Sequence, residues 1–104
     1  MDDREFAQGA DQVLAHIEAV LEAAGGDLDF ELAPGGVLEI EFADGGKMII
    51  NRHAITKEIW VAARSGGFHF RKEGESWVDT RSGEPLMVLL SRLVSEQAGM
   101  PVQF

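Results

Sequence analysis

The chain has 104 residues, of which 45% are hydrophobic and 26% charged, a composition typical of one globular domain and not of a disordered chain. It contains no cysteine, which excludes disulfide frameworks, thiolate nucleophiles, and zinc or iron–sulfur sites held by cysteine. A formal net charge of −9 at pH 7 disfavours nucleic acid as a partner.

The first predicted element is an amphipathic helix over residues 4–24, where apolar residues recur at helical spacing and Gly25-Gly26 follows. Short alternations of apolar and polar residues come next, separated by glycine-rich turns, and such alternation predicts strands. Gly66-Gly67 is predicted to be one of these turns. The predicted strands cover residues 27–32, 37–42, 47–52, 58–63, 68–70 and 76–78.

A second helix is predicted to begin with Pro85 at its first position and to end at Gly99. Residues 100–104 are predicted to form an extended tail, packed by Val102 or Phe104. Strands this short, joined by turns this small, can only be antiparallel neighbours. The fold class is therefore predicted to be α+β: a two-layer sandwich in a single domain, residues 1–104. Two helices cover one face of an antiparallel sheet of about six strands, and the other face is open to water.

Signals for export or membrane insertion are missing from the sequence. The N-terminus is acidic where a signal peptide needs a basic start and an apolar stretch. The longest aliphatic run, residues 86–90, is far too short to cross a bilayer. We expect a soluble cytoplasmic protein that has no membrane partner.

Catalytic motifs are also missing, so we expect a protein that is not an enzyme. His16, His53 and His69 lack metal-ligand spacing, and His69 is predicted to be an exposed strand residue without a role. The serines lie in no nucleophile-elbow context, and no glycine-rich loop opens a helix to hold phosphate. No catalytic residue and no organic cofactor are predicted.

The acidic residues are concentrated in the first half of the sequence. Residues 1–46 carry twelve acidic residues and one basic residue, a net charge of −11, whereas residues 47–104 carry six acidic and eight basic residues. Glu18 and Glu22 are four positions apart on the predicted helix, so their carboxylates lie close together. Asp27, Asp29 and Glu31 follow on the adjacent strand. Clusters of oxygen ligands suit weakly bound hard cations such as Mg²⁺, Ca²⁺, Mn²⁺ or iron, or a basic partner; a solvated acidic helix face is the alternative.

Trp60 is predicted to lie on the open face of the sheet, opposite in phase to Ile59 and Val61 and beside Asn51. A large aromatic side chain on a solvent face is frequently an interface anchor, although it can also simply cover a neighbouring strand. Trp60 could also cluster there with Arg52 and Arg64.

The sequence resembles the frataxin family, particularly its bacterial members, over essentially the whole chain. The run that carries the resemblance begins with GGVLEIEF at residues 35–42 and GKMIINR at residues 46–52. It continues with IWVA at residues 59–62, GGFHF at residues 66–70, and Trp77 followed by DTRSGE at residues 79–84. The family fold, a helix, an antiparallel sheet and a second helix, agrees with the architecture predicted above.

The resemblance implies an iron-binding accessory protein of iron–sulfur cluster assembly, which docks on the cysteine desulfurase–scaffold complex and regulates it. It further implies that iron, Fe²⁺ or Fe³⁺, binds weakly to an acidic ridge on the first helix and first strand, and that the protein is mostly a monomer with possible iron-driven oligomers. Carried over by position, the ridge consists of Asp3, Glu18, Glu22, Asp27, Asp29 and Glu31. The residues expected to bind the partner are Glu18, Glu22, Asn51, Trp60 and Arg64.

Two other functions stay open at this point: a ferroxidase or iron-storage protein that acts as oligomers, and an acidic interaction module without a physiological metal. The sequence also departs from the family pattern. Ala19, Ala23 and Gly25 stand where many bacterial relatives have further acidic residues, which makes the ridge thinner. In the loop before Trp60, residues 53–55 read His-Ala-Ile and Glu58 stands at a usual glutamine position, which places a negative charge beside the tryptophan.

Overall fold

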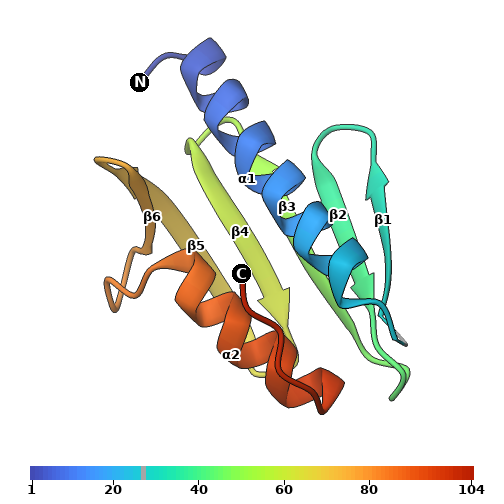
Figure 1. Cartoon of the computed structure of the whole chain (residues 1–104). Coiled ribbons are helices and arrows are strands. Elements are labelled where there is room, and N and C mark those ends of the chain that lie inside the picture. Colours follow the sequence, from blue (N-terminus) through green and yellow to red (C-terminus); the bar gives the residue numbers. More distant parts are fainter. Residues whose placement is uncertain (27) are drawn as a thin grey trace.

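The computed structural model describes residues 1–26 and 28–104 and has the order helix, six strands, helix. The elements are α1 (Asp3–Ala24), β1 (Asp29–Ala33), β2 (Val37–Glu41), β3 (Lys47–His53), β4 (Glu58–Ala63), β5 (Gly66–Glu73), β6 (Ser76–Asp79) and α2 (Leu86–Ala98). The strands form one antiparallel sheet in chain order, and both helices lie on the same face of it (Figure 1). The predicted α+β sandwich is confirmed.

The core lies between the helices and the sheet face that they cover. Alternate residues of the strands point into it, as the period of two requires. They pack against the apolar stripe of each helix, so the side chains of helices and sheet form one layer from which water is excluded. Its most completely buried large side chains are Phe6, Ile17, Leu21, Leu38, Ile40, Met48, Ile50, Ile59, Phe70, Leu86, Leu89 and Leu90.

The helix ends follow the sequence closely. The Asp2 carboxylate caps α1 by accepting a hydrogen bond from the backbone N–H of Glu5 (2.8 Å), and Gly25 ends the helix. α2 begins at Leu86 and not, as predicted, at Pro85: with ψ at 141° Pro85 is extended and serves as the N-cap. Gly99 ends α2 in the left-handed conformation (φ 71°), as predicted.

The connection between β4 and β5 differs from the prediction. The turn is formed by Arg64 and Ser65, whereas Gly66 and Gly67 already belong to β5, opposite residues 63 and 62 of β4. The prediction was wrong because Gly66 looks like a turn residue by composition, yet it takes its unusual φ of 141° at the first position of the strand.

The C-terminal tail is anchored to α2 by two serine hydroxyls. Ser95 Oγ accepts from the Val102 N–H (2.9 Å) and donates to its carbonyl oxygen (3.1 Å), and the Phe104 N–H donates to Ser91 Oγ (2.9 Å). Val102 is buried, as predicted for the tail. Among the described residues, no helix is both long and apolar enough to cross a membrane.

Candidate functional site

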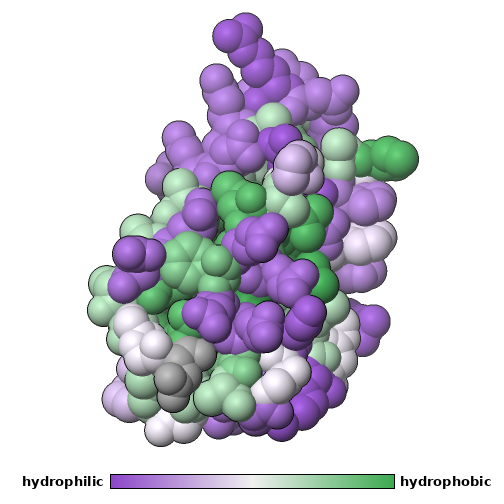
Figure 2. Space-filling model, turned by 90° about the vertical axis from the view of Figure 1, so that its right-hand side faces the viewer, coloured by the Kyte–Doolittle hydropathy of each residue, from purple (hydrophilic) through white to green (hydrophobic). Residues whose placement is uncertain are grey.

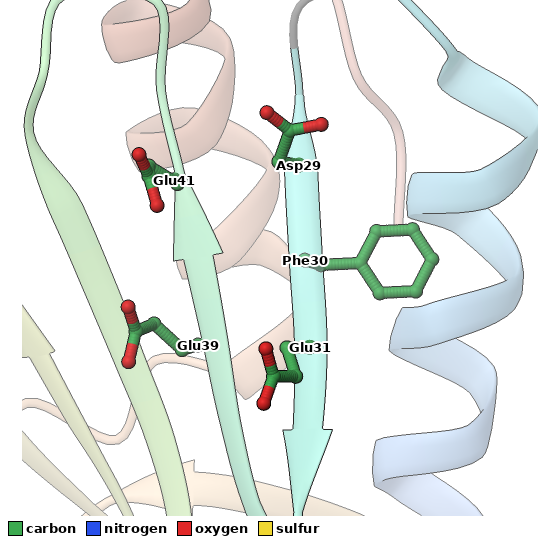
Figure 3. A pocket seen from close by; sticks show the side chains of 5 residues that line it. All are labelled: Asp29, Phe30, Glu31, Glu39 and Glu41. Atoms are coloured by element: carbon green, nitrogen blue, oxygen red, sulfur yellow. The ribbon is translucent and has the colours of Figure 1, made fainter.

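Four acidic residues stand opposite one another in pairs on the open face of β1 and β2. The register places Asp29 opposite Glu41 and Glu31 opposite Glu39. Phe30, between the two β1 acids, points to the other side, toward α1 (Figure 3). We call Asp29, Glu31, Glu39 and Glu41 the strand acids. They arise from two runs that alternate acidic and apolar residues, folded against each other by the turn at Pro34–Gly36.

The strand acids line a shallow depression together with Phe30. Lys47, opposite Glu41 in the sheet, forms an ion pair with Glu39 (Nζ–Oε1 2.9 Å). The hydrogen bond to Glu39, and then the charges of Glu39 and Glu41, raise the pKa of Lys47 above its ordinary value. One ammonium group thus faces four carboxylates, and the site keeps an excess of negative charge.

This arrangement costs stability, because like charges directly opposite each other in a sheet repel. It also supplies what hard cations prefer, several carboxylate oxygens on one surface. Within residues 1–26 and 28–104, no group of three or more acidic or histidine side chains is close enough to enclose a metal ion. The geometry therefore provides an open, weakly coordinating negative surface and not a closed metal centre.

The helix acids Glu18 and Glu22 lie near the C-terminal end of α1, where the helix packs beside β1 (Figure 1). Glu22 is exposed and Glu18 half-buried. Asp29 and Glu31 point to the sheet face opposite the helices, so the predicted ridge divides into two groups separated by β1. Seen from this edge, apolar patches lie between clusters of hydrophilic side chains (Figure 2). Val20 of α1 and Phe30 of β1 are half-buried and pack against the core.

One predicted ridge residue, Asp3, does not join these groups. Asp3 is the first residue of α1, and its carboxylate pairs with Lys57 in the turn between β3 and β4 (3.0 Å). At a rise of about 1.5 Å per residue, Asp3 lies about 22 Å along the helix from Glu18. Asp27 lies outside the described residues.

Trp60 is on the open face, as predicted, with Asn51 opposite it on β3 and His69 opposite it on β5. Its indole is half-buried because it stacks between two imidazoles, of His53 (ring centroids 3.9 Å apart) and His69 (4.4 Å). The indole Nε1–H donates to Glu58 Oε1 (2.9 Å). The aromatic side chain and both of its neighbours thus form one ordered group on the surface.

The arginines do not cluster with Trp60, so that prediction was wrong. Arg52 stands opposite Ile59, whose side chain is buried against the helices, and it reaches Asp11 of α1 from that covered face (2.6 Å). Arg64 lies in the turn after β4 and pairs with Asp44 (3.2 Å). The Gly46 backbone N–H, and then the contacts of Gln97 and Arg64, hold the pKa of Asp44 below its ordinary value.

Sequence reasoning did not identify Glu39 and Glu41 as site residues, although a signal was present. Both alternate with buried Leu38 and Ile40, which already places them on the open face. Pairing that strand with the preceding one across the glycine turn would have set them opposite the β1 acids. The stack of His53 on Trp60 was also missed, because it depends on the register of β3 against β4.

Comparison with known proteins identifies relatives over the whole chain. A family model described as "Frataxin-like domain" matches residues 1–100. A protein of Dechloromonas aromatica named "Iron-sulfur cluster assembly protein CyaY" is 68% identical over 95% of this chain and 94% of its own length. A protein of the same name from Cupriavidus taiwanensis is 50% identical over 100% of this chain and 96% of its own.

Solved structures give the same result. Frataxin from Psychromonas ingrahamii superposes with a TM-score of 0.92 at 35% identity, covering 99% of this chain and 97% of its own. Trimeric frataxin from the yeast Saccharomyces cerevisiae, in a structure complexed with ferrous iron, gives a TM-score of 0.76 at 32% identity. That match covers 88% of this chain and 86% of the yeast chain.

Proposed function

This chain belongs to the frataxin family, and from that membership we propose that it is an iron-binding accessory protein acting on the cysteine desulfurase–scaffold complex of iron–sulfur cluster assembly. The family is one of non-enzymatic accessory proteins. Relatives named for cluster assembly and a yeast frataxin complexed with ferrous iron support this proposal. The observation that carries it is the two pairs of opposed acidic residues on the open face of the β1–β2 hairpin.

Iron is proposed to be cargo held weakly by the acidic residues. Carboxylate oxygens bind Fe²⁺ and Fe³⁺ together with water, and an exposed site exchanges its ion readily. Facing like charges that repel in the free protein are stabilised when a cation lies between them, so part of their cost is recovered on binding. Glu39 and Glu41 extend the predicted set, partly offsetting the acids that the helix lacks at positions 19, 23 and 25.

Anaerobic Fe²⁺ titration calorimetry of two double variants tests the iron proposal and separates the two groups. Asp29→Asn with Glu31→Gln changes the strand acids, and Glu18→Gln with Glu22→Gln changes the helix acids. We expect each to weaken Fe²⁺ binding, because each removes two charges from the negative surface. Glu73→Gln with Glu75→Gln, which removes two acidic charges around the turn between β5 and β6, is the matched control. Equal affinities in all four proteins would disprove iron binding at these acids.

Docking is proposed to use two features together, the negative surface and the open sheet face. The acidic residues attract a basic patch on the desulfurase, which sets the association rate and its dependence on salt. Trp60 and Asn51 supply contact area on the sheet. Arg64 is the weakest member of the predicted set, because it is engaged with Asp44 at the end of β4.

A pull-down from native bacterial extract, with and without ferrous iron, tests the docking proposal through recovery of a cysteine desulfurase. Trp60→Ala should weaken binding by about 2 kcal/mol, which is about thirtyfold, while the fold is kept. Glu18→Lys with Glu22→Lys should slow association at low salt and flatten its dependence on ionic strength. Unchanged recovery with all three substitutions would contradict this docking surface.

A further inference from the structure

The indole of Trp60 is held on three sides by residues of three strands. His53 lies parallel to one face of the ring, with an interplanar angle of 6°, and His69 lies parallel to the other, with an angle of 9°. The indole N–H donates to Glu58 two residues earlier on the same strand. The antiparallel register produces this group, because His69 is opposite Trp60 and His53 is opposite Glu58.

Both faces of the indole and its only polar atom are therefore occupied within the chain itself. A partner that approaches the sheet meets the outer edge of the indole and the edges of the two imidazoles. Stacked aromatic rings hold one another in a fixed orientation, so Trp60 does not have to be ordered when a partner binds. His53, His69 and Glu58 are positioning residues for the tryptophan.

Histidine is the side chain that most commonly acts as a proton switch in proteins, and here two imidazoles lie against the faces of one indole. An imidazolium over an indole is attracted by the negative face of the ring, so protonation keeps the stack closed. His53 Nδ1 contacts Thr56 Oγ1 (2.9 Å), and that hydroxyl accepts when Nδ1 carries a proton and donates when Nδ1 carries none. His69 Nδ1 lies 3.8 Å from Glu58 Oε1.

The charged groups around the stack are few in the described part of the chain. Glu58 faces it from β4, and Arg71 stands opposite Glu58 on β5, where it is paired with Glu73 (4.0 Å). Lys57, in the turn between β3 and β4, is paired with Asp3. Protonation of both imidazoles would therefore add two positive charges beside the carboxylate of Glu58 and the guanidinium of Arg71, and the surface around Trp60 would gain positive charge.

We propose that His53, His69 and Glu58 form a proton-responsive clamp, which presents the edge of Trp60 and sets the charge of the surface around it. As far as it concerns docking, this inference rests on the proposed function. A partner attracted by the acidic surface carries positive charge, so protonation of the clamp weakens its docking. Docking affinity should therefore decrease as the pH is lowered, and His53 and His69 should account for the decrease.

Proton NMR of the three imidazoles tests the clamp without any partner. His16, on the exposed side of α1, is an internal reference. In the wild type, the imidazole signals of His53 and His69 should lie upfield of those of His16, because the indole shields rings stacked on its faces. The Trp60 indole N–H signal should move with pH between 5 and 8. Trp60→Leu should bring the His53 and His69 signals to the position of those of His16.

Matched variants separate the clamp from a merely structural role. His53→Gln with His69→Gln should abolish the pH response of the Trp60 N–H signal, whereas His16→Gln should leave it unchanged. Unshielded His53 and His69 signals, or a pH response that survives the double variant, would overturn the proposal.

Affinity for the desulfurase–scaffold complex at pH 6 and pH 8 separates this inference from the proposed function. Wild type should bind about fivefold more weakly at pH 6, and the ratio should approach one in His53→Gln with His69→Gln. Shielded, titrating imidazoles without any binding of the complex would refute the proposed docking and leave the clamp standing. Binding whose pH ratio is the same in both proteins would refute the effect of the clamp on docking.

Discussion

The facing carboxylates of β1 and β2 provide a test of what the acidic surface costs. Asp29→Asn together with Glu31→Gln removes one charge from each facing pair and leaves the Lys47–Glu39 ion pair intact. Facing charge pairs contribute about 0.2–1 kcal/mol each, so the double variant should be about 1 kcal/mol more stable than the wild type at low salt. For a domain of this size, that difference raises Tm by about 4–8 °C.

A bound cation should produce the same kind of stabilisation in the wild type. At ten times its Kd, an ion that binds only the native state adds about 1.4 kcal/mol by mass action. The double variant should respond less, because half of its strand acids are neutral. Its advantage over the wild type should also shrink at high salt, since screening weakens the repulsion between exposed carboxylates.

Thermal unfolding followed by circular dichroism, with and without Mn²⁺ and at low and high salt, measures all three effects. Glu73→Gln with Glu75→Gln is the matched control, because it removes two acidic charges around the turn between β5 and β6, at the other end of the sheet. A lower Tm in Asp29→Asn with Glu31→Gln than in the control would refute the reasoning. A full response to Mn²⁺ in that variant would show that the ion is held elsewhere.

Three further outcomes follow from single contacts. Trp77→Ala should cost about 3–5 kcal/mol in urea denaturation, because the indole is 6% exposed and its ring centroid lies 6.0 Å from that of Phe6; a loss below about 1 kcal/mol would contradict this. Gly36→Ala should lower Tm, because Gly36 has a φ of 76° and an added Cβ would lie 2.6 Å from the Arg52 side chain; an unchanged Tm would mean that the turn rearranges. Asp44→Asn should lower Tm at neutral pH, with a difference that disappears as the pH falls below the ordinary carboxyl pKa of 3.8, because a lowered pKa stabilises the fold only while the carboxylate is ionised. A difference that persists in acid would assign the effect to packing.

The fold was predictable from the sequence because each of its signals is local. Helical spacing ends at Gly25 and Gly99, and alternation places buried residues on one face of each strand without reference to any other strand. The errors are also local. Pro85 was predicted to be the first helical residue but is the N-cap, and Gly66 was predicted to be a turn residue but begins β5. Both errors arise because composition does not reveal the ψ or φ that a residue takes.

The candidate site was less predictable because it depends on which residues stand opposite each other. Glu39 and Glu41 became site residues only through the register of β2 against β1. The stack around Trp60 needs two registers at once, β3 with β4 and β4 with β5. Arg52 illustrates the same limit. Its phase places it with the buried residues of β3, and its guanidinium pairs with the exposed carboxylate of Asp11 on α1.

The division of the acidic residues by β1 decides how iron and a basic partner would influence each other. Two ligands that use the same carboxylates exclude each other. Ligands bound to separate groups of carboxylates influence each other only through long-range electrostatics, an effect that is weaker than direct competition and is screened by salt. The strand acids share the open face with Trp60, and Glu18 and Glu22 lie on the helix layer across the edge strand. Under the proposed function, iron on the strand acids would therefore reduce the attraction of a basic patch docked on the same face, while the helix acids would keep part of that attraction. Because linkage is reciprocal, docking must lower iron affinity by the factor by which iron lowers docking. A protein built in this way would release its ion as it reaches its partner.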